Sequence, residues 1–470
     1  MKFEEMENDK RLEFIESAVN SFKTGALREA EESRAYYSTN NPDIAARKKQ
    51  YATMLTETTD GDSTMRAVAK ENKFAANEKV ASSFFRDITD SKAQYLAGEG
   101  ADVTAVEDSE QAVVDQLNEL LGEQIKRRGQ ACLTDALTYK AGYAYMQVIN
   151  GKIKLAYIPY CEVLPFRNEY DELIAVIRYY ERGKRKFAEY HTPAMIYRYR
   201  NDGENGDGWE LIEELPQIQT VTKYGDGSIT VEGGKKWPRL PWFELWHNNE
   251  HTSSLTNAAK TMIRCYDIVL SDFANNLIDV QDVFISLKDS YGSGGADWGE
   301  QLELLKNFKI GENVENVTTL EIPHVARETL LSMLKADIYA ALRGVDVGRI
   351  SGGNLTNTAI RALYSDIDLW ADQAEWHIKD WVSDIYETAA AYLGVTLPAI
   401  KINLTRRAIF DDVATMDALA RQKGVISNKT LFENHPLVTD AQAEIERIDA
   451  EELDAAYSNG EGGGSEIGFI

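Results

Sequence analysis

Two histidines four residues apart are the first feature of this sequence that could do chemistry. His247 and His251 lie on either side of Glu250 in the string HNNEH, and on a helix this spacing would place both imidazoles on one face, as in metal sites. The pattern departs from a zinc-protease motif, because Asn248 stands where the general-base glutamate would be. The string also follows a strand-like segment and precedes a predicted helix N-terminus. We therefore interpret it as a polar strand-to-helix turn.

Motifs for nucleotide, ester and calcium chemistry are missing. The Gly-Lys pairs at 151, 183 and 234 are followed by Ile, Arg and Lys, where a phosphate-binding loop has the Ser or Thr that binds magnesium. The glycine-rich string at 292–295 has the wrong order for a nucleophile elbow. The acidic loop at 201–208 lacks the register of a calcium loop. We expect that the chain is not an enzyme and needs no cofactor and no metal.

Composition narrows the class of protein further. The 470 residues carry 51 Lys+Arg and 76 Asp+Glu, so the net charge is 51 − 76 = −25 at pH 7. This balance argues against a surface that wraps DNA by neutralising phosphates. Three dispersed cysteines indicate neither a disulfide framework nor a zinc site. The N-terminus lacks a signal peptide and no apolar run is long enough to span a membrane, so we expect a soluble, intracellular protein.

Local patterns divide the chain into helical and strand-like stretches. Apolar residues recur at helical spacing through most of residues 1–150. Between 143 and 246, strand-like strings separated by turns such as Asn150-Gly151 predict an antiparallel sheet built on hairpins. After residue 394 we expect one strand-like segment (AIKINLTRRAIF), a helical stretch and a disordered tail at 458–470.

Long helical patterns dominate the second half of the chain. The spacing predicts one amphipathic helix of about 45 Å over residues 253–283, a second over residues 324–342, and a third of about 55 Å over residues 357–393. A small mixed segment, 284–323, separates the first two, and the glycine-punctuated loop GVDVGRISGGN (344–354) precedes the third. In a monomer these rods would have nothing to pack against, so their apolar stripes predict packing between subunits.

Six strings, in order along the chain, resemble motifs of one protein family. They are NKFAANEKVASSFFRDITDSKAQYLAGEG (72–100); ALTYKAGYAYMQV (136–148) with YIPYCEVLPF (157–166) and IRYY (177–180); RLPWFELWHNNEH (239–251); YDIVLSDFANNLIDVQDVFISLKD (266–289); SGGNLTNTAIRALYSDIDLWADQAE (351–375); and ISNKTLFENHPLVTDAQAEIERIDAEE (426–452). In this order they resemble the portal proteins of tailed bacteriophages, in particular the type found in long-tailed phages of Gram-positive hosts.

The resemblance implies an α+β phage portal fold with a wing, long stem helices, a small α/β clip, a tunnel loop with a long spine helix, and a helical crown. In this sequence it assigns 1–252 to the N-terminal α/β part of the wing, 253–283 to a stem helix, 284–323 to the clip, 324–343 to a second stem helix, 344–356 to the tunnel loop, 357–410 to the spine helix and a wing strand, 411–457 to the crown and 458–470 to a disordered tail.

The resemblance also implies a function and a set of partners. Portal proteins form a ring, usually of twelve subunits, at one vertex of the capsid, around a channel through which DNA is packaged and ejected. The clip would bind the large terminase subunit and later the head-completion adaptor, and the wing would meet major capsid and scaffolding proteins. Double-stranded DNA would pass without sequence specificity, and no membrane is involved. The protein would belong to the virion and assemble in the host cytoplasm.

Two groups of residues follow as expected contact sites. The DNA-channel group at the tunnel loop is Arg343, Gly348, Arg349, Ser351, Gly352, Gly353, Asn354 and Thr356. The clip group that would meet terminase and adaptor is Tyr291, Trp298, Glu300, Lys306 and Lys309. An acidic channel with few mobile donors suits DNA that must slide. If a fixed cation contacted every phosphate, those contacts would have to be broken at each step.

Two other functions remain open from the residues alone. One is a monomeric structural or adaptor protein that binds partners through the long helices. The other is a metal-dependent hydrolase using His247, His251 and Glu250. Formation of a closed ring separates the portal hypothesis from the first, and absence of turnover with bound metal separates it from the second.

Overall fold

The computed structural model describes residues 6–48, 50–59, 62–71, 76–203, 208–223, 229–233, 236–280, 324–346, 348, 357–406 and short stretches between 421 and 450. The chain divides into two compact units. Unit 1 comprises Met1–Asp346 and Asp366–Arg407, and unit 2 comprises Val347–Ser365 and Ala408–Ile470. The predicted clip, most of the tunnel loop, much of the predicted crown and the tail lie outside the described residues.

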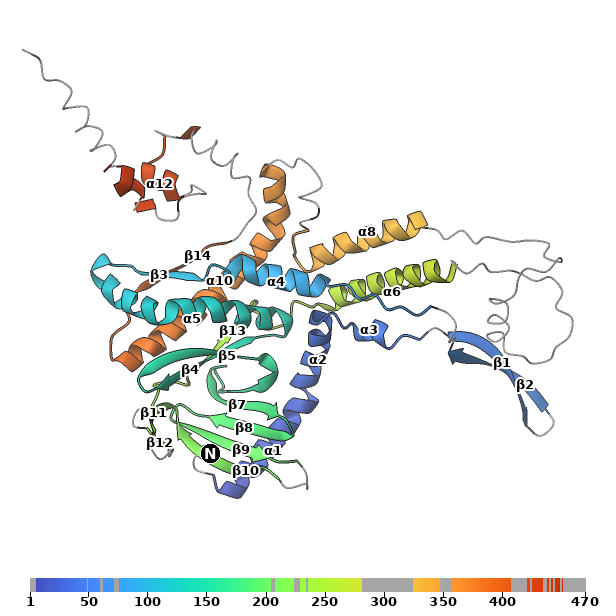
Figure 1. Ribbon diagram of the computed structural model, residues 1–470, viewed down its shortest axis with the longest axis horizontal. Helices are drawn as coiled ribbons and strands as arrows, with labels where there is room; N and C mark the ends of the chain where they lie inside the picture. The colour runs from blue at the N-terminus through green and yellow to red at the C-terminus, as the bar shows by residue number, and fades with distance from the viewer. Residues whose placement is uncertain are drawn as a thin grey trace, which may run out of the picture. The chain divides into compact units, whose positions relative to one another are not determined.

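Unit 1 contains groups of helices and groups of strands that follow one another along the chain (Figure 1). The α-helices of the described residues, including those of unit 2, are α1 (Asn8–Thr24), α2 (Ala26–Tyr37), α3 (Pro42–Ala45), α4 (Phe84–Ala97), α5 (Gln111–Thr138), α6 (Asn257–Val280), α8 (His324–Ala341), α10 (Asn357–Leu393) and α12 (Asn428–Glu433). The strands are β1 (Gln50–Thr59), β2 (Asp62–Glu71), β3 (Ala101–Ala105), β4 (Gly142–Ile149), β5 (Lys152–Ile158), β6 (Val163–Arg167), β7 (Leu173–Arg182), β8 (Arg185–His191), β9 (Met195–Asn201), β10 (Glu210–Pro216), β11 (Ile218–Lys223), β12 (Ile229–Glu232), β13 (Trp242–Leu245) and β14 (Ile400–Leu404).

The strands form four separate sheets. One is a five-stranded antiparallel sheet in the order β10-β9-β8-β7-β6. A second has the order β12-β11-β4-β13 with β5 paired to β4, and in it β11 runs parallel to β4. The pairs β1-β2 and β14-β3 complete the set within the described residues. The prediction of a single antiparallel sheet built on hairpins was therefore too simple, because sequence-adjacent strands divide between two sheets and one pairing is parallel.

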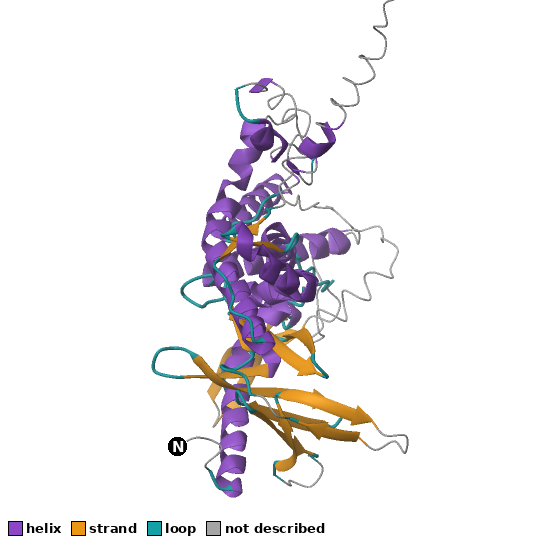
Figure 2. Ribbon diagram, turned by 90° about the vertical axis from the view of Figure 1, so that its left-hand side faces the viewer, coloured by secondary structure: helices purple, strands orange, loops and turns teal. Residues whose placement is uncertain are grey.

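Helix α1 covers one face of the five-stranded sheet. Ile15, Val19 and Phe22, spaced three to four residues apart, are buried against sheet residues such as Tyr199. The strands of the two five-stranded sheets lie at one end of unit 1 with α1 alongside, whereas the β14-β3 pair lies among the helices (Figures 1 and 2). Apolar spacing thus accounts for both the helix and the face that it buries.

The remaining helices of unit 1 form a second layer. Tyr386 of α10 donates a hydrogen bond of 2.6 Å to the side chain of Asn118 on α5. Trp381 of α10 packs over Gly129 of α5, where a larger residue would meet its ring. Helices α6 and α8 lie side by side (Figure 1), and the first turns of α6 and the end of α8 share a buried cluster with α2 and α4. The two helices that correspond to the predicted stem are thus fixed at one end by a core.

Unit 2 includes the first residues of α10 and the short helix α12. Ser427 precedes α12, and its hydroxyl accepts a hydrogen bond from the backbone N–H of Thr430 at 3.2 Å. This is the arrangement of a helix N-cap.

The helix predictions agree closely with the structure. The expected limits 324–342 and 357–393 compare with His324–Ala341 and Asn357–Leu393. α10 ends at Gly394, whose φ of +74° is the left-handed conformation that favours glycine. Asn150 and Gly151, predicted as a hairpin turn, both have positive φ and join β4 to β5. The hairpin β1-β2 lies in a region that was predicted to be mostly helical.

Candidate functional site

The HNNEH segment is a packed turn. His247 is buried, and its Nδ1 accepts a hydrogen bond from the Trp370 indole at 3.5 Å while its Nε2 lies 2.8 Å from the carbonyl of Thr252. Both ring nitrogens are thus engaged, and burial, with nearby Lys92, lowers the pKa of His247 to about 3. The ring of His251 stacks on Trp246 at 3.7 Å between centroids.

This geometry supports the turn interpretation over the metal pair. A zinc-binding histidine needs a free nitrogen lone pair aimed at the metal, and His247 uses both nitrogens within the fold. Among the residues that the structure describes, no group of three or more His, Cys, Asp or Glu side chains could hold a metal ion.

The predicted DNA-channel group begins at the end of α8, where Arg343 closes the helix. The Gly344 N–H bonds the Tyr339 carbonyl at 2.8 Å and the Arg343 N–H bonds the Ala340 carbonyl at 3.1 Å, which is the Schellman pattern of a helix C-terminus. Arg343 occupies the left-handed position of this motif with φ of +51°, where glycine is usual. An exposed arginine is therefore held in a strained backbone conformation next to the predicted tunnel loop.

A buried lysine from α4 holds the same helix end. The ammonium of Lys92 donates a hydrogen bond of 3.1 Å to the Leu342 carbonyl and lies 4.4 Å from the centroid of the Trp370 ring. It thereby satisfies a carbonyl that the end of α8 would leave unbonded. Burial, and then the charge of Arg343, lowers the pKa of Lys92 to about 7.

The residues that follow are also anchored. Asp346 forms an ion pair of 3.0 Å with Lys335 of α8. A Cβ on Gly344 would meet the side chain of Ile88 at 2.8 Å. The absence of a side chain at Gly344 therefore serves close packing against α4. The end of the predicted second stem helix and the start of the predicted tunnel loop, from Leu342 to Asp346, are held in place by α4 and α8.

The other members of the predicted contact sites are mostly not described. Gly348 is described as part of unit 2. Outside the described residues lie Arg349, Ser351, Gly352, Gly353, Asn354 and Thr356 of the channel group and Tyr291, Trp298, Glu300, Lys306 and Lys309 of the clip group.

A feature that sequence reasoning missed is a row of polar side chains on α6, which we call the α6 ladder: Asp267, Ser271 and Asn275. They accept hydrogen bonds from the backbone N–H groups of Ser82 at 2.9 Å, Val80 at 3.0 Å and Glu78 at 2.7 Å, respectively. Four residues of helix rise about 6 Å and two residues of extended chain about 6.6 Å, so the two repeats match. The ladder therefore binds an extended segment along α6 through the backbone of that segment.

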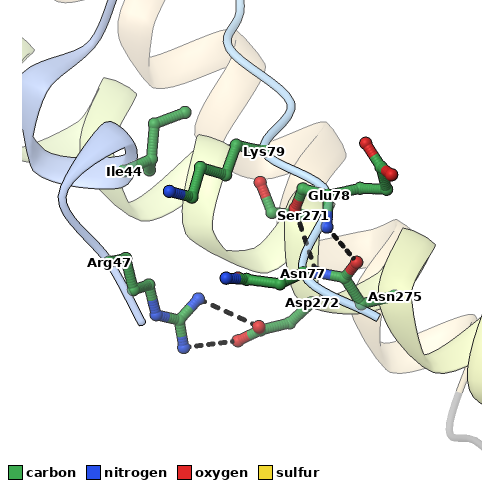
Figure 3. Close-up of a pocket in the computed structure, with 8 residues that line it drawn as sticks. All are labelled: Ile44, Arg47, Asn77, Glu78, Lys79, Ser271, Asp272 and Asn275. Carbon is green, nitrogen blue, oxygen red and sulfur yellow. Dashed lines mark hydrogen bonds and ion pairs between the residues drawn. The ribbon is translucent and has the colours of Figure 1, made fainter. Parts of the chain in front are cut away.

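Next to the ladder, Arg47 forms a two-pronged ion pair with Asp272, each nitrogen lying 2.9 Å from an oxygen (Figure 3). In the same view Asn275 faces the backbone of Glu78. The cavity among these residues measures about 10 Å³, room for a single water molecule. The close-up therefore shows a packing seam between α6 and the 77–79 segment, too small for an organic ligand.

The ladder had a signal in the sequence. Asp267, Ser271 and Asn275 recur every four residues on a helix whose neighbouring positions are largely apolar. A polar stripe at that spacing marks one face of a helix. The same residues stand in the string YDIVLSDFANN, which carried part of the family resemblance.

Comparison with known proteins assigns the chain to a family. The family described as "Phage portal protein, SPP1 Gp6-like" matches residues 24–457. The chain belongs to this family of phage portal proteins. The predicted family and the α+β portal fold class are thereby confirmed, and the chain is a portal protein of the phage head-to-tail connector.

Two curated portal proteins are similar over most of their length. That of Clostridium phage phiCD119 is 23% identical over 418 residues, which cover 82% of this chain and 88% of the relative. That of Bacillus phage SPP1 is 23% identical over 427 residues, which cover 83% and 80%. Both phages are named for Gram-positive genera, as the resemblance implied.

Solved structures are similar to this chain at lower sequence identity. The neck of an empty GTA particle computed with C6 symmetry contains a chain with TM-score 0.37 and 13% identity, covering 74% of this portal protein and 87% of that chain. A chain of the virion of a native gene transfer agent particle has TM-score 0.35 and 14% identity, covering 74% and 86%. The family assignment rests on the sequence matches.

Portal proteins are structural components of the phage particle, so family membership gives no support to a hydrolase. No helix in the described part of the chain is long and apolar enough to cross a membrane. The α6 ladder joins α6 to the 78–82 segment, and Lys92 joins α4 to the end of α8. These side chains attach one segment of the chain to another through hydrogen bonds.

Proposed function

We propose that this portal protein forms a closed ring, of twelve subunits as is usual for portals, at one capsid vertex. The ring encloses the channel through which DNA is packaged and ejected. The large terminase subunit docks on it during packaging and the head-completion adaptor afterwards. The protein assembles in the host cytoplasm, where its wing meets major capsid and scaffolding proteins.

The observation that carries the proposal is the apolar surface of the stem helices. The wing-proximal ends of α6 and α8 are buried together around Ile263 and Ile338. Farther along, the two helices expose large apolar side chains with exposed fractions of 41–64%: Leu277, Ile278, Val325, Leu330 and Met333. Such surface on long helices favours contact with further helices, which neighbouring subunits would supply.

The charge of the chain supports the channel. A net charge of −25 for each subunit disfavours tight binding of phosphates, so DNA can slide past the ring. Arg343 stands at the entry of the tunnel loop in a strained conformation, as a residue retained for function often does. In this proposal the Leu342–Asp346 segment is a fixed base from which the tunnel loop continues.

Ring formation is tested by mass and shape. Twelve chains of 52.8 kDa weigh about 630 kDa (12 × 52.8), and negative-stain images should show a central hole. Met333→Glu places a charge on the exposed stem surface and should abolish the ring, whereas Val106→Glu, which is equally exposed on another part of unit 1, should leave it. A stable monomer at every protein and salt concentration would favour the adaptor hypothesis. Intact rings of Met333→Glu would show that the stem surface is not part of the interface between subunits.

The tunnel loop is tested by packaging. Replacing Gly352 and Gly353 with proline restricts the backbone at two adjacent positions of the loop. We expect intact rings that package less DNA. Wild-type packaging by such rings would remove the loop from the mechanism.

A further inference from the structure

The segment that leads into the β1-β2 hairpin lies along α6. The Asn41 amide donates a hydrogen bond of 2.8 Å to Asp267, and farther along the helix Arg47 pairs with Asp272 at 2.9 Å. From residue 41 to residue 47 the chain therefore runs towards the C-terminal end of α6. We call the 41–47 segment the first leg of the hairpin.

The segment that follows the hairpin, 78–82, returns along the same helix, and we call it the second leg. It is bound by the α6 ladder, with the backbone of Glu78 at Asn275. The ammonium of Lys79 joins the two legs through a hydrogen bond of 2.5 Å to the Ala45 carbonyl. The hairpin is thus attached to α6 by both legs and lies towards the C-terminal end of that helix (Figure 1).

The two faces of the hairpin differ in charge. In the register of β1 and β2, alternate residues of each strand share a face with their partners. One face has no charged residue over four successive pairs, and we call it the uncharged face: Ala52, Met54, Thr56, Thr58, Ser63, Met65, Ala67 and Ala69. At its base the same face ends in the Gln50–Glu71 pair. The opposite face contains the other charges of the two strands: Glu57, Asp62, Arg66 and Lys70.

A hairpin with one uncharged and one charged face has the pattern of an antiparallel sheet that is packed on one side. Strands β1 and β2 form a two-stranded sheet of their own, and no other described helix or strand makes more than slight contact with them. A two-stranded hairpin alone is at best marginally stable in water, and packing against a helix or a further strand stabilises it. The uncharged face therefore requires a partner from outside the described part of the chain.

We propose that the uncharged face packs on the exposed apolar surface of α6 and α8 in the adjacent subunit. Rotation about the axis of a ring carries every residue to the same height in the next copy. The second leg ends its contact with α6 at Asn275, and Leu277 and Ile278 are exposed just beyond that residue. The next copy therefore presents the same apolar side chains at the height where the hairpin begins.

The hairpin is long enough for this contact. Each of its strands has ten residues and spans about 30 Å, whereas packed helices lie about 8–10 Å apart. A contact between two different surfaces is heterologous, and repeating it generates a ring when the rotation closes. This inference rests on the proposed ring and names a second copy as the partner of the hairpin.

Two adjacent residues of β2 provide a matched test. Ala67 belongs to the uncharged face and Val68 to the opposite one. Ala67→Glu should lower the fraction of chain in rings at limiting concentration by at least about tenfold, because the new carboxylate would be buried without a partner. Val68→Glu adds the same charge to the other face and should leave the ring fraction unchanged. Tryptophan fluorescence checks that both variants keep the fold of unit 1.

A cross-link identifies the partner. Ala67→Cys and Leu277→Cys are combined with Cys161→Ser and Cys265→Ser, which leaves the buried thiol of Cys132. A short bis-maleimide should then give a ladder of covalent oligomers on a denaturing gel. A product cross-linked only within single chains would place the hairpin on α6 of its own subunit and overturn the inference.

The control for the cross-link pairs Ala67→Cys with Val106→Cys, an exposed position on another part of unit 1, and should give no ladder. Rings of full mass from Ala67→Glu, with no ladder from the Ala67→Cys and Leu277→Cys pair, would overturn the docking contact and leave the proposed function intact. If such rings no longer entered capsids, the uncharged face would instead bind a capsid protein. A wild-type chain that forms no rings, with no ladder from the cysteine pair, would overturn both proposals.

Discussion

Asp267 and Asp272 lie five residues apart on α6, and both accept hydrogen bonds from side chains of the 41–47 segment, yet only Asp267 is buried. Asp267 is fully buried and accepts from the Asn41 amide at 2.8 Å and from the Ser82 N–H at 2.9 Å. Asp272 pairs with Arg47 at 2.9 Å, and its side chain is 35% exposed. The two aspartates should therefore contribute very differently to stability.

The first prediction compares these two positions. Asp267→Ala leaves the buried Asn41 amide and the Ser82 N–H without acceptors, and should lower the free energy of unfolding by roughly 2–4 kcal/mol. Asp272→Ala removes a solvent-screened ion pair, and should cost less than about 1 kcal/mol. Urea unfolding followed by tryptophan fluorescence measures both. Equal losses would show that the α6 ladder does not anchor the 78–82 segment.

The second prediction concerns pH. The pKa of Lys92 falls from 10.5 to about 7 in the fold, so between these values the unfolded chain binds a proton that the folded chain lacks. Stability from this group is therefore lost as pH falls through that window, and rises with pH by up to about 1.4 kcal/mol per pH unit. Lys92→Met should lack this rise. Unfolding midpoints at pH 7, 8 and 9 measure it, with the exposed Lys140→Met as control, and a difference from wild type that stays constant with pH would contradict it.

The third prediction separates stability from function at Arg343. Because Arg343 has φ of +51°, Arg343→Gly should relieve strain and stabilise the chain by about 0.5–1 kcal/mol. Ala341→Gly, two residues earlier in α8, should destabilise by about 1 kcal/mol. If Arg343 acts on DNA, Arg343→Gly rings should be more stable and yet package less. Unchanged DNA packaging would show that Arg343 has only a structural role.

The fourth prediction uses two glycines with opposite surroundings. A Cβ on Gly142 would collide with the backbone of Cys132, so Gly142→Ala should cost roughly 3 kcal/mol or more. Gly122 lies within α5 with no atom within 4 Å of such a Cβ, so Gly122→Ala should stabilise by about 0.5–1 kcal/mol. Thermal unfolding distinguishes the two. A tolerated Gly142→Ala would mean that β4 can move away from α5.

Local patterns were enough for the long elements of this chain. The 3–4 spacing of apolar residues predicted α10 nearly to the residue, and Gly394 marked its end, because both signals act within one or two turns of helix. The Asn150-Gly151 turn was predicted for the same reason, since Asn and Gly readily adopt the positive φ that such a turn needs. Family membership was also within reach of the sequence, because it depends on ordered strings and on no three-dimensional contact.

Long-range pairing was decided only by the tertiary structure. The β1-β2 hairpin, the parallel β4-β11 pair and the division into separate sheets depend on contacts between distant residues, which local periodicity does not specify. The geometry that argues against a metal at His247 depends on Trp370, 123 residues away, whose indole N–H bonds one of the ring nitrogens of His247.

The hydrogen bonds between distant segments could likewise be predicted from the sequence only in part. The polar stripe of the α6 ladder is legible in the sequence, but its partner, the backbone of residues 78–82, carries no side-chain signal that could reveal the contact. The burial of Lys92 depends on α4 meeting the end of α8. Sequence determined the helices, their faces and the family, because these follow from spacing along the chain. Tertiary structure decided which polar groups meet, because hydrogen bonds and burial join residues that the chain keeps far apart.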